Sequence, residues 1–147
     1  MPIPKAVKVK KNGVEFISSV DRAKYLITEL NRAALREVGN LVRRRALDEV
    51  RKMKGFRRGK RPLKAFQFWV RRREGNLQVG IKHDTWYGVK QELGTSKQPR
   101  RAILTNAVMQ NIDDIRRIEG AYLSTIENEN KALGLINEED EGDNTDE

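Results

Sequence analysis

The sequence predicts an α+β fold in which a small, mostly antiparallel sheet packs against two long amphipathic helices. Two patterns predict it: apolar residues recur at steps of three and four in two long stretches, and they alternate with polar residues in three short ones. Neither helix can bury its apolar stripe alone, so the apolar face of the sheet is their shared partner. We expect helices at 20–53 and 100–126, and strands at 66–73, 77–83 and 86–93.

A hairpin is expected ahead of the first helix. Two alternating segments, 7–10 and 14–17, flank Asn12-Gly13, a pair that favours the tight primed turn matching the twist of paired strands. Isolated hairpins are marginally stable in water. This one must therefore lean on the rest of the domain or on a neighbouring subunit.

The first helix is expected to be long, about 50 Å at roughly 1.5 Å per residue. Ser18 followed by Asp21 resembles a capping box at its start, and Gly39-Asn40 in its middle is a candidate for a bend. The run 43–45 holds three arginines, which cannot all face one way because successive helical residues lie about 100° apart. We interpret them as a solvated helical face rather than a dedicated phosphate site.

Residues 54–64 combine two glycines, one proline and six basic residues, which predicts an exposed loop. The aromatic ring of Phe56 could stack on a base. The loop is the best candidate for contacts with DNA or with an acidic partner, through Arg57, Arg58, Lys60, Arg61 and Lys64.

The two strands after the loop should form a hairpin with one apolar face toward the helices and one cationic face. Trp69 falls on the cationic face. It is either a packed cross-strand aromatic covered by arginine side chains or, with Trp86 nearby in the sequence, part of a subunit interface, where tryptophan is enriched.

A corner is expected where the third strand ends near Leu93 and the second helix begins near Pro99. Gly94 permits backbone angles closed to other residues, and the hydroxyls of Thr95 and Ser96 can bind nearby amides. The carboxylate of Glu92 can accept amides of this turn or the first amides of the helix. This structural role is favoured over a metal ligand or general base.

The residue types present give little support for a catalytic or metal-binding site. The chain has no cysteine, and its one histidine, His83, has no paired ligand at a recognisable spacing. Asp84, Glu92 and Lys97 could form the residue set of a metal nuclease, but such spacing arises readily by chance among 35% charged residues. We expect no cofactor, no metal and no enzymatic activity.

Charge divides the chain into a basic body and an acidic tail. Residues 127–147 hold nine acidic residues and one lysine, a net charge of −8, whereas residues 1–126 hold 29 basic and 12 acidic residues, a net charge of +17. We expect one domain over 1–126 and a tail over 127–147 that is disordered alone, with Leu133, Leu135 and Ile136 docking on an adjacent subunit. A basic body attracts phosphate backbones or acidic proteins.

An ordered motif carries a resemblance to a known family. It runs from about residue 20 to 126 and is most specific at Tyr87, Glu92, Gly94, Thr95, Ser96, Lys97 and Pro99, followed by Ile103, Leu104 and Ala107. This order resembles the neck and tail-completion family of long-tailed bacteriophages. Leu93 stands where an aromatic residue is common in that family, and Ala102 where a proline is common.

The resemblance implies a structural virion protein rather than an enzyme. Its members form a homo-oligomeric ring, on the order of six or twelve copies, at the head–tail junction, after assembly in the host cytoplasm. The ring would join head-closure or connector proteins to the tail terminator or tail tube, and would let DNA pass without sequence-specific contacts. No run of about 18 apolar residues exists, so no membrane partner is expected. The alternatives are a basic, nonspecific nucleic-acid-binding accessory protein and a metal nuclease.

Overall fold

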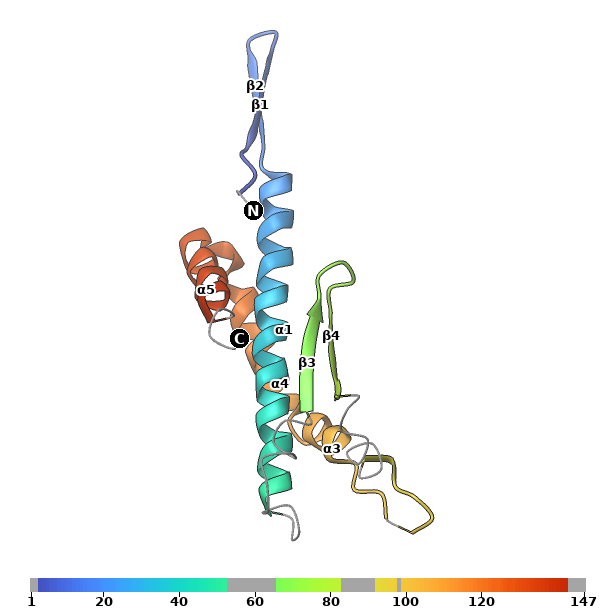
Figure 1. Ribbon diagram of the computed structural model, residues 1–147. Helices are drawn as coiled ribbons and strands as arrows, with labels where there is room; N and C mark the ends of the chain where they lie inside the picture. Colours follow the sequence, from blue (N-terminus) through green and yellow to red (C-terminus); the bar gives the residue numbers. More distant parts are fainter. Residues whose placement is uncertain (1–2, 53–65, 83–91, 98, 143–147) are drawn as a thin grey trace. The chain divides into compact units, whose positions relative to one another are not determined.

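The computed structural model describes residues 3–52, 66–82, 92–97 and 99–142 (Figure 1). Within them the fold is α+β, as predicted, with a long N-terminal helix, two small antiparallel sheets and C-terminal helices. The chain divides into two compact units, Met1–Ala34 with Gly120–Glu147, and Leu35–Glu119. None of the described helices combines the length and the apolar character that crossing a membrane requires.

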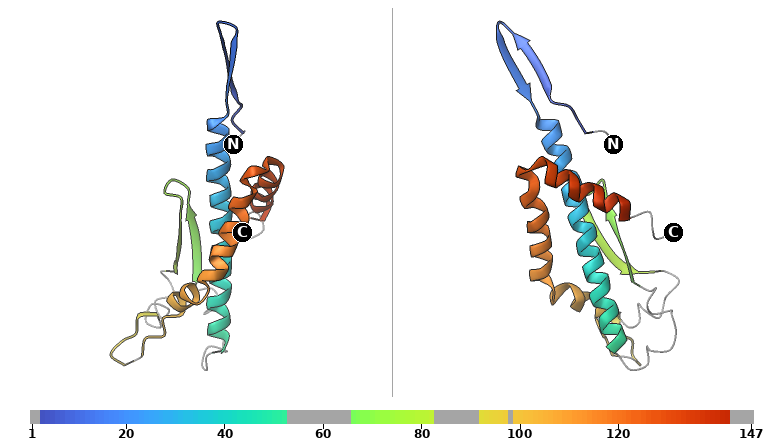
Figure 2. Two further views of the ribbon diagram at one scale, coloured as in Figure 1. Left: turned by 180° about the vertical axis from the view of Figure 1, so that it is seen from behind. Right: turned by 90° about the vertical axis from the view of Figure 1, so that its left-hand side faces the viewer.

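The predicted N-terminal hairpin is confirmed. Strands β1 (Val7–Lys11) and β2 (Val14–Ser18) pair antiparallel, with Val9 opposite Phe16. Asn12 and Gly13 have φ angles of 52° and 79°, and positive values at both central residues are what the primed turn requires. Every residue of β1, and all but the last of β2, is exposed. Figure 2 draws these strands as an isolated pair.

The long helix is also confirmed: α1 (Val20–Lys52) continues to the last residue described before the gap. Leu26 and Leu30 in its first half pack against Ala132 and Ile136 of helix α5 (Glu129–Gly142). The expectation of a disordered tail is therefore wrong for α5. The expected docking of Leu133, Leu135 and Ile136 on an adjacent subunit is also wrong. Ile136 is 3% exposed within its own chain, and Leu133 and Leu135 pack, partly buried, against the same core.

The second half of α1 forms the core of the other unit. Strand β3 (Phe66–Arg71) pairs antiparallel with β4 (Asn76–Ile81), from Phe66 opposite Ile81 to Arg71 opposite Asn76. The apolar face of this hairpin packs on the helices, as predicted. The buried residues of this core are Val38, Val42, Ala46, Val50 and Phe66, together with Ile103 and Ala107 of helix α3 (Ile103–Met109).

Gly39 lets the sheet approach α1 closely. The ring of Phe68 on β3 lies 2.4 Å from the position a Cβ would take on Gly39, far closer than real Cβ contacts. Helix α1 is unbroken through this residue. The glycine that weakens the helix locally thus makes room for an aromatic ring.

The second predicted helix is not continuous. In place of a helix over 100–126 the chain forms α3, then α4 (Ile112–Leu123), then the 3₁₀ helix η2 (Ser124–Glu127). The amide of Asn111 donates to the carbonyl of Val108, and its side chain donates to the carbonyl of Ala107, 2.7 Å away. The carbonyl of Asn111 then accepts the amide of Ile115, so Asn111 lies between the two helices and bonds to both.

The third strand cannot be assessed over most of its length, because residues 86–91 lie outside the described part of the chain. Its expected end is wrong, since Glu92 and Leu93 adopt a helical turn. The sheet of this unit has two strands among the described residues.

Candidate interface corner at Glu92

The carboxylate of Glu92 holds the first turn of α3. Its Oε2 accepts the amide of Leu104 at 2.9 Å, and its Oε1 accepts the amide and the hydroxyl of Thr105 at 3.1 and 3.0 Å. The first amides of a helix have no partner within it and carry partial positive charge. The structural role predicted for Glu92 is therefore confirmed, in the form of a cap supplied by a residue eleven positions before the start of the helix.

The backbone between Glu92 and α3 needs two unusual conformations. Gly94 has φ of +78°, and a Cβ there would lie 2.8 Å from the backbone nitrogen of Arg100. Ala102, directly before α3, has φ of 46° and offers no side-chain cap. The amide of Ala102 donates to the carbonyl of Glu92 at 3.3 Å, which closes the loop. Glu92 supplies the cap that Ala102 cannot.

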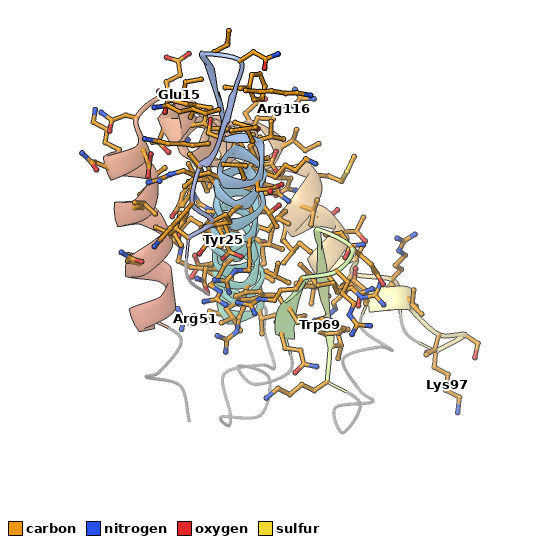
Figure 3. All side chains as sticks on the ribbon, turned by 90° about the horizontal axis from the view of Figure 1, so that it is seen from above. Glu15, Tyr25, Arg51, Trp69, Lys97 and Arg116 are labelled. Atoms are coloured by element: carbon orange, nitrogen blue, oxygen red, sulfur yellow. The ribbon has the colours of Figure 1, made fainter. Side chains whose placement is uncertain are left out.

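The outer side of this corner is exposed. The hydroxyl of Thr95 accepts the amide of Lys97 at 3.3 Å, as the turn chemistry predicts. Leu93 is 66% exposed, and the exposed residues that follow it are Thr95, Ser96, Lys97, Pro99 and Arg100. Figure 3 labels Lys97 on this segment, with its side chain directed away from the helices. The corner is thus fixed from inside by Glu92, and its outer side chains are exposed.

Trp69 lies on β3 (Figure 3) and is 44% exposed. Its ring lies 3.7 Å from the position a Cβ would take on Gly80 of the paired strand, so the ring covers that glycine. This cross-strand packing matches one of the two predicted roles. The exposed part of Trp69 leaves surface for the other predicted role, a subunit interface. Trp86 lies outside the described residues.

The basic loop predicted to contact DNA also lies outside them, with Arg57, Arg58, Lys60, Arg61 and Lys64. The three arginines of 43–45, however, lie within the described residues and form two groups that face different directions. Arg43 and Arg44 join Arg51, Asn40 and Leu47 around a groove of about 280 Å³ on α1. The Nε of Arg43 donates to the carbonyl of Phe66 at 3.2 Å, which fixes the guanidinium.

Arg45 faces another direction. Its Nη2 lies 3.8 Å from a carboxylate oxygen of Asp114 on α4. The prediction that the three arginines cannot face one way is confirmed. The interpretation as a merely solvated face is incomplete, because it missed the shared groove of Arg43, Arg44 and Arg51.

The residues proposed for metal or acid–base chemistry are not brought together within the described part of the chain. Both carboxylate oxygens of Glu92 accept hydrogen bonds from α3, and His83 and Asp84 lie outside the described ranges. Across the residues that can be placed, no three side chains of the histidine, cysteine, aspartate and glutamate types gather as metal ligands do.

Two features of α3 and of its junction with α4 were not predicted from the sequence. Thr105 was not assigned a role, although a hydroxyl in the first turn of a helix is a natural donor to a capping carboxylate. The break at Asn111 was missed as well, although asparagine followed by Asp113 and Asp114 is a helix-start signal.

Comparison of the chain with models of protein families, with curated proteins and with solved structures found no match.

Proposed function

We propose that this chain is a structural subunit of a tailed phage or prophage particle, which assembles into a closed ring at the junction of head and tail. The observation that supports it best is the corner. In the described part of the family-like motif, 92–97 and Pro99, the carboxylate of Glu92 binds the first turn of α3, while Leu93, Thr95, Ser96, Lys97 and Pro99 are exposed. Such a hydrogen-bonded turn with exposed side chains suits a repeated contact between copies.

A ring requires a heterologous interface, in which one surface of each copy meets a different surface of the next. The corner supplies one fixed surface. Leu93 and Met109, which are 66% and 63% exposed, add apolar area in the same unit. Apolar side chains exposed beside a locked turn favour protein contact over solvent.

The partners would be the head-closure or connector proteins on one side and the tail terminator or tail tube on the other, with DNA passing through the lumen. A charge of +17 over residues 1–126, repeated around a ring, would hold DNA too tightly to slide if all of it faced inward. The pair of Arg22 with Glu129 neutralises part of it within the chain, because Glu129 belongs to the acidic segment 127–147. Neighbouring subunits would neutralise more.

Complementation of a phage or prophage that lacks the gene tests the proposal. We expect the double variant Glu92→Ala with Gly94→Val to yield separate heads and tails and few infectious particles, because the corner loses its cap and its turn. Glu49→Gln, which removes only an exposed contact to Lys52, is the matched control and should complement fully. Full infectivity of the double variant would contradict the proposal.

A second function is favoured by the groove on α1: nonspecific binding of nucleic acid. Arg43, Arg44 and Arg51 line the groove with Asn40 and Leu47, and Nη1 of Arg51 also contacts Oδ1 of Asp48 at 3.4 Å. Guanidinium groups bind phosphate in bidentate fashion. A protein of this kind would bind duplex DNA as a monomer or dimer with steep salt dependence.

Neighbouring arginines give a sharp test of this second function. Arg44→Gln should weaken binding of duplex DNA and lower the slope of log K against log salt by about one, whereas Arg45→Gln, on the Asp114 side, should change neither. Equal effects of the two substitutions, measured by fluorescence anisotropy over a salt series, would contradict a role for the groove.

A further inference from the structure

The N-terminal hairpin has one mainly apolar side and one mainly charged side. Residues directly opposite in an antiparallel pair point to the same side, and neighbours along a strand point to opposite sides. The pairing of Val9 with Phe16 therefore places four apolar residues together, which we call the hairpin apolar face: Val7, Val9, Val14 and Phe16. Lys11, opposite Val14, and Ser18, opposite Val7, lie on the same side at its two ends. Lys8, Lys10, Glu15 and Ile17 lie on the other face.

This apolar face is uncovered. Its four side chains are 52%, 49%, 69% and 66% exposed. The β3–β4 hairpin differs, because its apolar residues pack into a core with α1 and α3. A two-stranded hairpin with nothing packed on it is marginal in water. A partner that buries the apolar face would therefore stabilise the β1–β2 hairpin.

The same unit carries a surface of complementary chemistry. Leu123 at the end of α4 and Ile126 in η2 are 43% and 36% exposed. The segment that follows, 127–147, has a net charge of −8, whereas residues 7–18 hold three lysines and one glutamate, a net charge of +2. The hairpin is apolar and basic, and the region from Leu123 onward is apolar and acidic.

We propose that the hairpin apolar face of one copy docks on the Leu123–Ile126 surface of a second copy. Each copy has both surfaces, so the contact is heterologous and can continue from copy to copy. The hairpin and the segment 127–147 carry opposite net charges, so they attract each other, and salt screens this attraction. This contact gives the proposed ring a specific subunit interface. It rests on the proposed function for the closure of successive contacts into a ring.

The chain contains no cysteine, so engineered thiols can report this contact directly. Two single variants, Phe16→Cys and Leu123→Cys, are purified, mixed in equal amounts and oxidised. We expect a disulfide-linked dimer of the two different variants. Ile17→Cys mixed with Leu123→Cys is the matched control, because Ile17 is 55% exposed on the opposite face of the same hairpin.

The products separate the alternatives. A mixed dimer formed with Phe16→Cys well above the Ile17→Cys control supports the proposal. Dimers of Phe16→Cys with itself as the main product would instead assign the face to a second hairpin and overturn it. A double variant with both cysteines that closes an internal bond at high dilution, without mixed dimers in the first experiment, would assign it to the same chain and also overturn it.

Sedimentation velocity gives an independent readout. We expect Val9→Ser with Phe16→Ser to reduce association of the purified chain at least tenfold, and Ile17→Ser to leave it within twofold of the unaltered protein. Association should also weaken as salt rises, because opposite charges are screened. Equal effects of the two variants overturn the hairpin contact. If the variant Val9→Ser with Phe16→Ser still forms rings in particles, the proposed hairpin contact is overturned, whereas the proposed ring is not. If the chain is absent from particles, the ring fails while the contact stands or falls by the crosslink.

Discussion

At the scale of single residues, Glu92 fixes the corner by binding the first turn of α3. Its carboxylate receives two amides and a hydroxyl from the first turn of α3, and its carbonyl receives the amide of Ala102. Ala102 has a left-handed conformation that ends the approach to the helix without a cap of its own. The capping group therefore comes from across the turn.

Removal of this carboxylate should destabilise the unit that contains α3. We expect Glu92→Ala to lower the free energy of unfolding by about 1–3 kcal/mol, the range for losing a helix cap and leaving amides without partners. Glu92→Gln keeps one acceptor oxygen and should recover part of the loss. Urea unfolding followed by circular dichroism measures both. Midpoints equal to that of the unaltered protein would show that the cap contributes nothing.

The role of Glu92 was predictable because a carboxylate before a helix start has few structural uses. The conformation of Ala102 was not, since nothing in its residue type favours positive φ. Proline is common at this position in the family that the motif resembles, and the sequence alone does not tell how alanine would be accommodated. Tertiary closure of the loop determines it.

At the scale of elements, α1 is a long helix whose two halves serve two different cores. Its register was predictable from apolar spacing, and so were both hairpins from their alternation and turns. The break between α3 and α4 was not, because the apolar spacing continues through Asn111. The docking of α5 was missed because acidic composition dominates that segment, although Ala132 and Ile136 are spaced to face one side.

Two glycines in helices should respond to alanine with opposite signs. Gly120→Ala in α4 should raise the free energy of unfolding by about 0.5–1 kcal/mol, because a Cβ there meets nothing within 4 Å and alanine is the better helix former. Gly39→Ala should lower it by about 1–3 kcal/mol, because the new Cβ would overlap the ring of Phe68.

Urea denaturation of both variants checks these signs. Adding Phe68→Ala to Gly39→Ala relieves the overlap, so the double variant should lose less stability than the sum of the two single variants. A stabilising Gly39→Ala would mean that Phe68 does not pack against α1.

Helix α5 should depend on Ile136. Ile136→Ala removes a side chain that is 3% exposed against Leu26 and Leu30, and should cost about 2–4 kcal/mol of docking free energy. Amide hydrogen exchange should accelerate over 129–136 and stay unchanged in α3. Asn137→Ala, an exposed neighbour, is the control. Unchanged exchange in α5 would contradict its packing on α1.

At the scale of the whole molecule, the chain separates its surfaces by chemistry. The hairpin is apolar and basic, the C-terminal segment is acidic, and the corner at Glu92 is held by hydrogen bonds to α3 and has exposed side chains. A chain with complementary surfaces of this kind is suited to repeated assembly. A single sequence contains no pattern that identifies the partners of the protein. The ring is therefore proposed from the motif resemblance.

The most direct test of the ring is electron cryomicroscopy of particles produced by the phage or prophage that encodes this chain, with a short epitope tag at its C-terminus. The proposal predicts a closed ring of the chain at the head–tail junction of every complete particle, with antibody bound at that level. Purified infectious particles that contain no copy of the chain would contradict it.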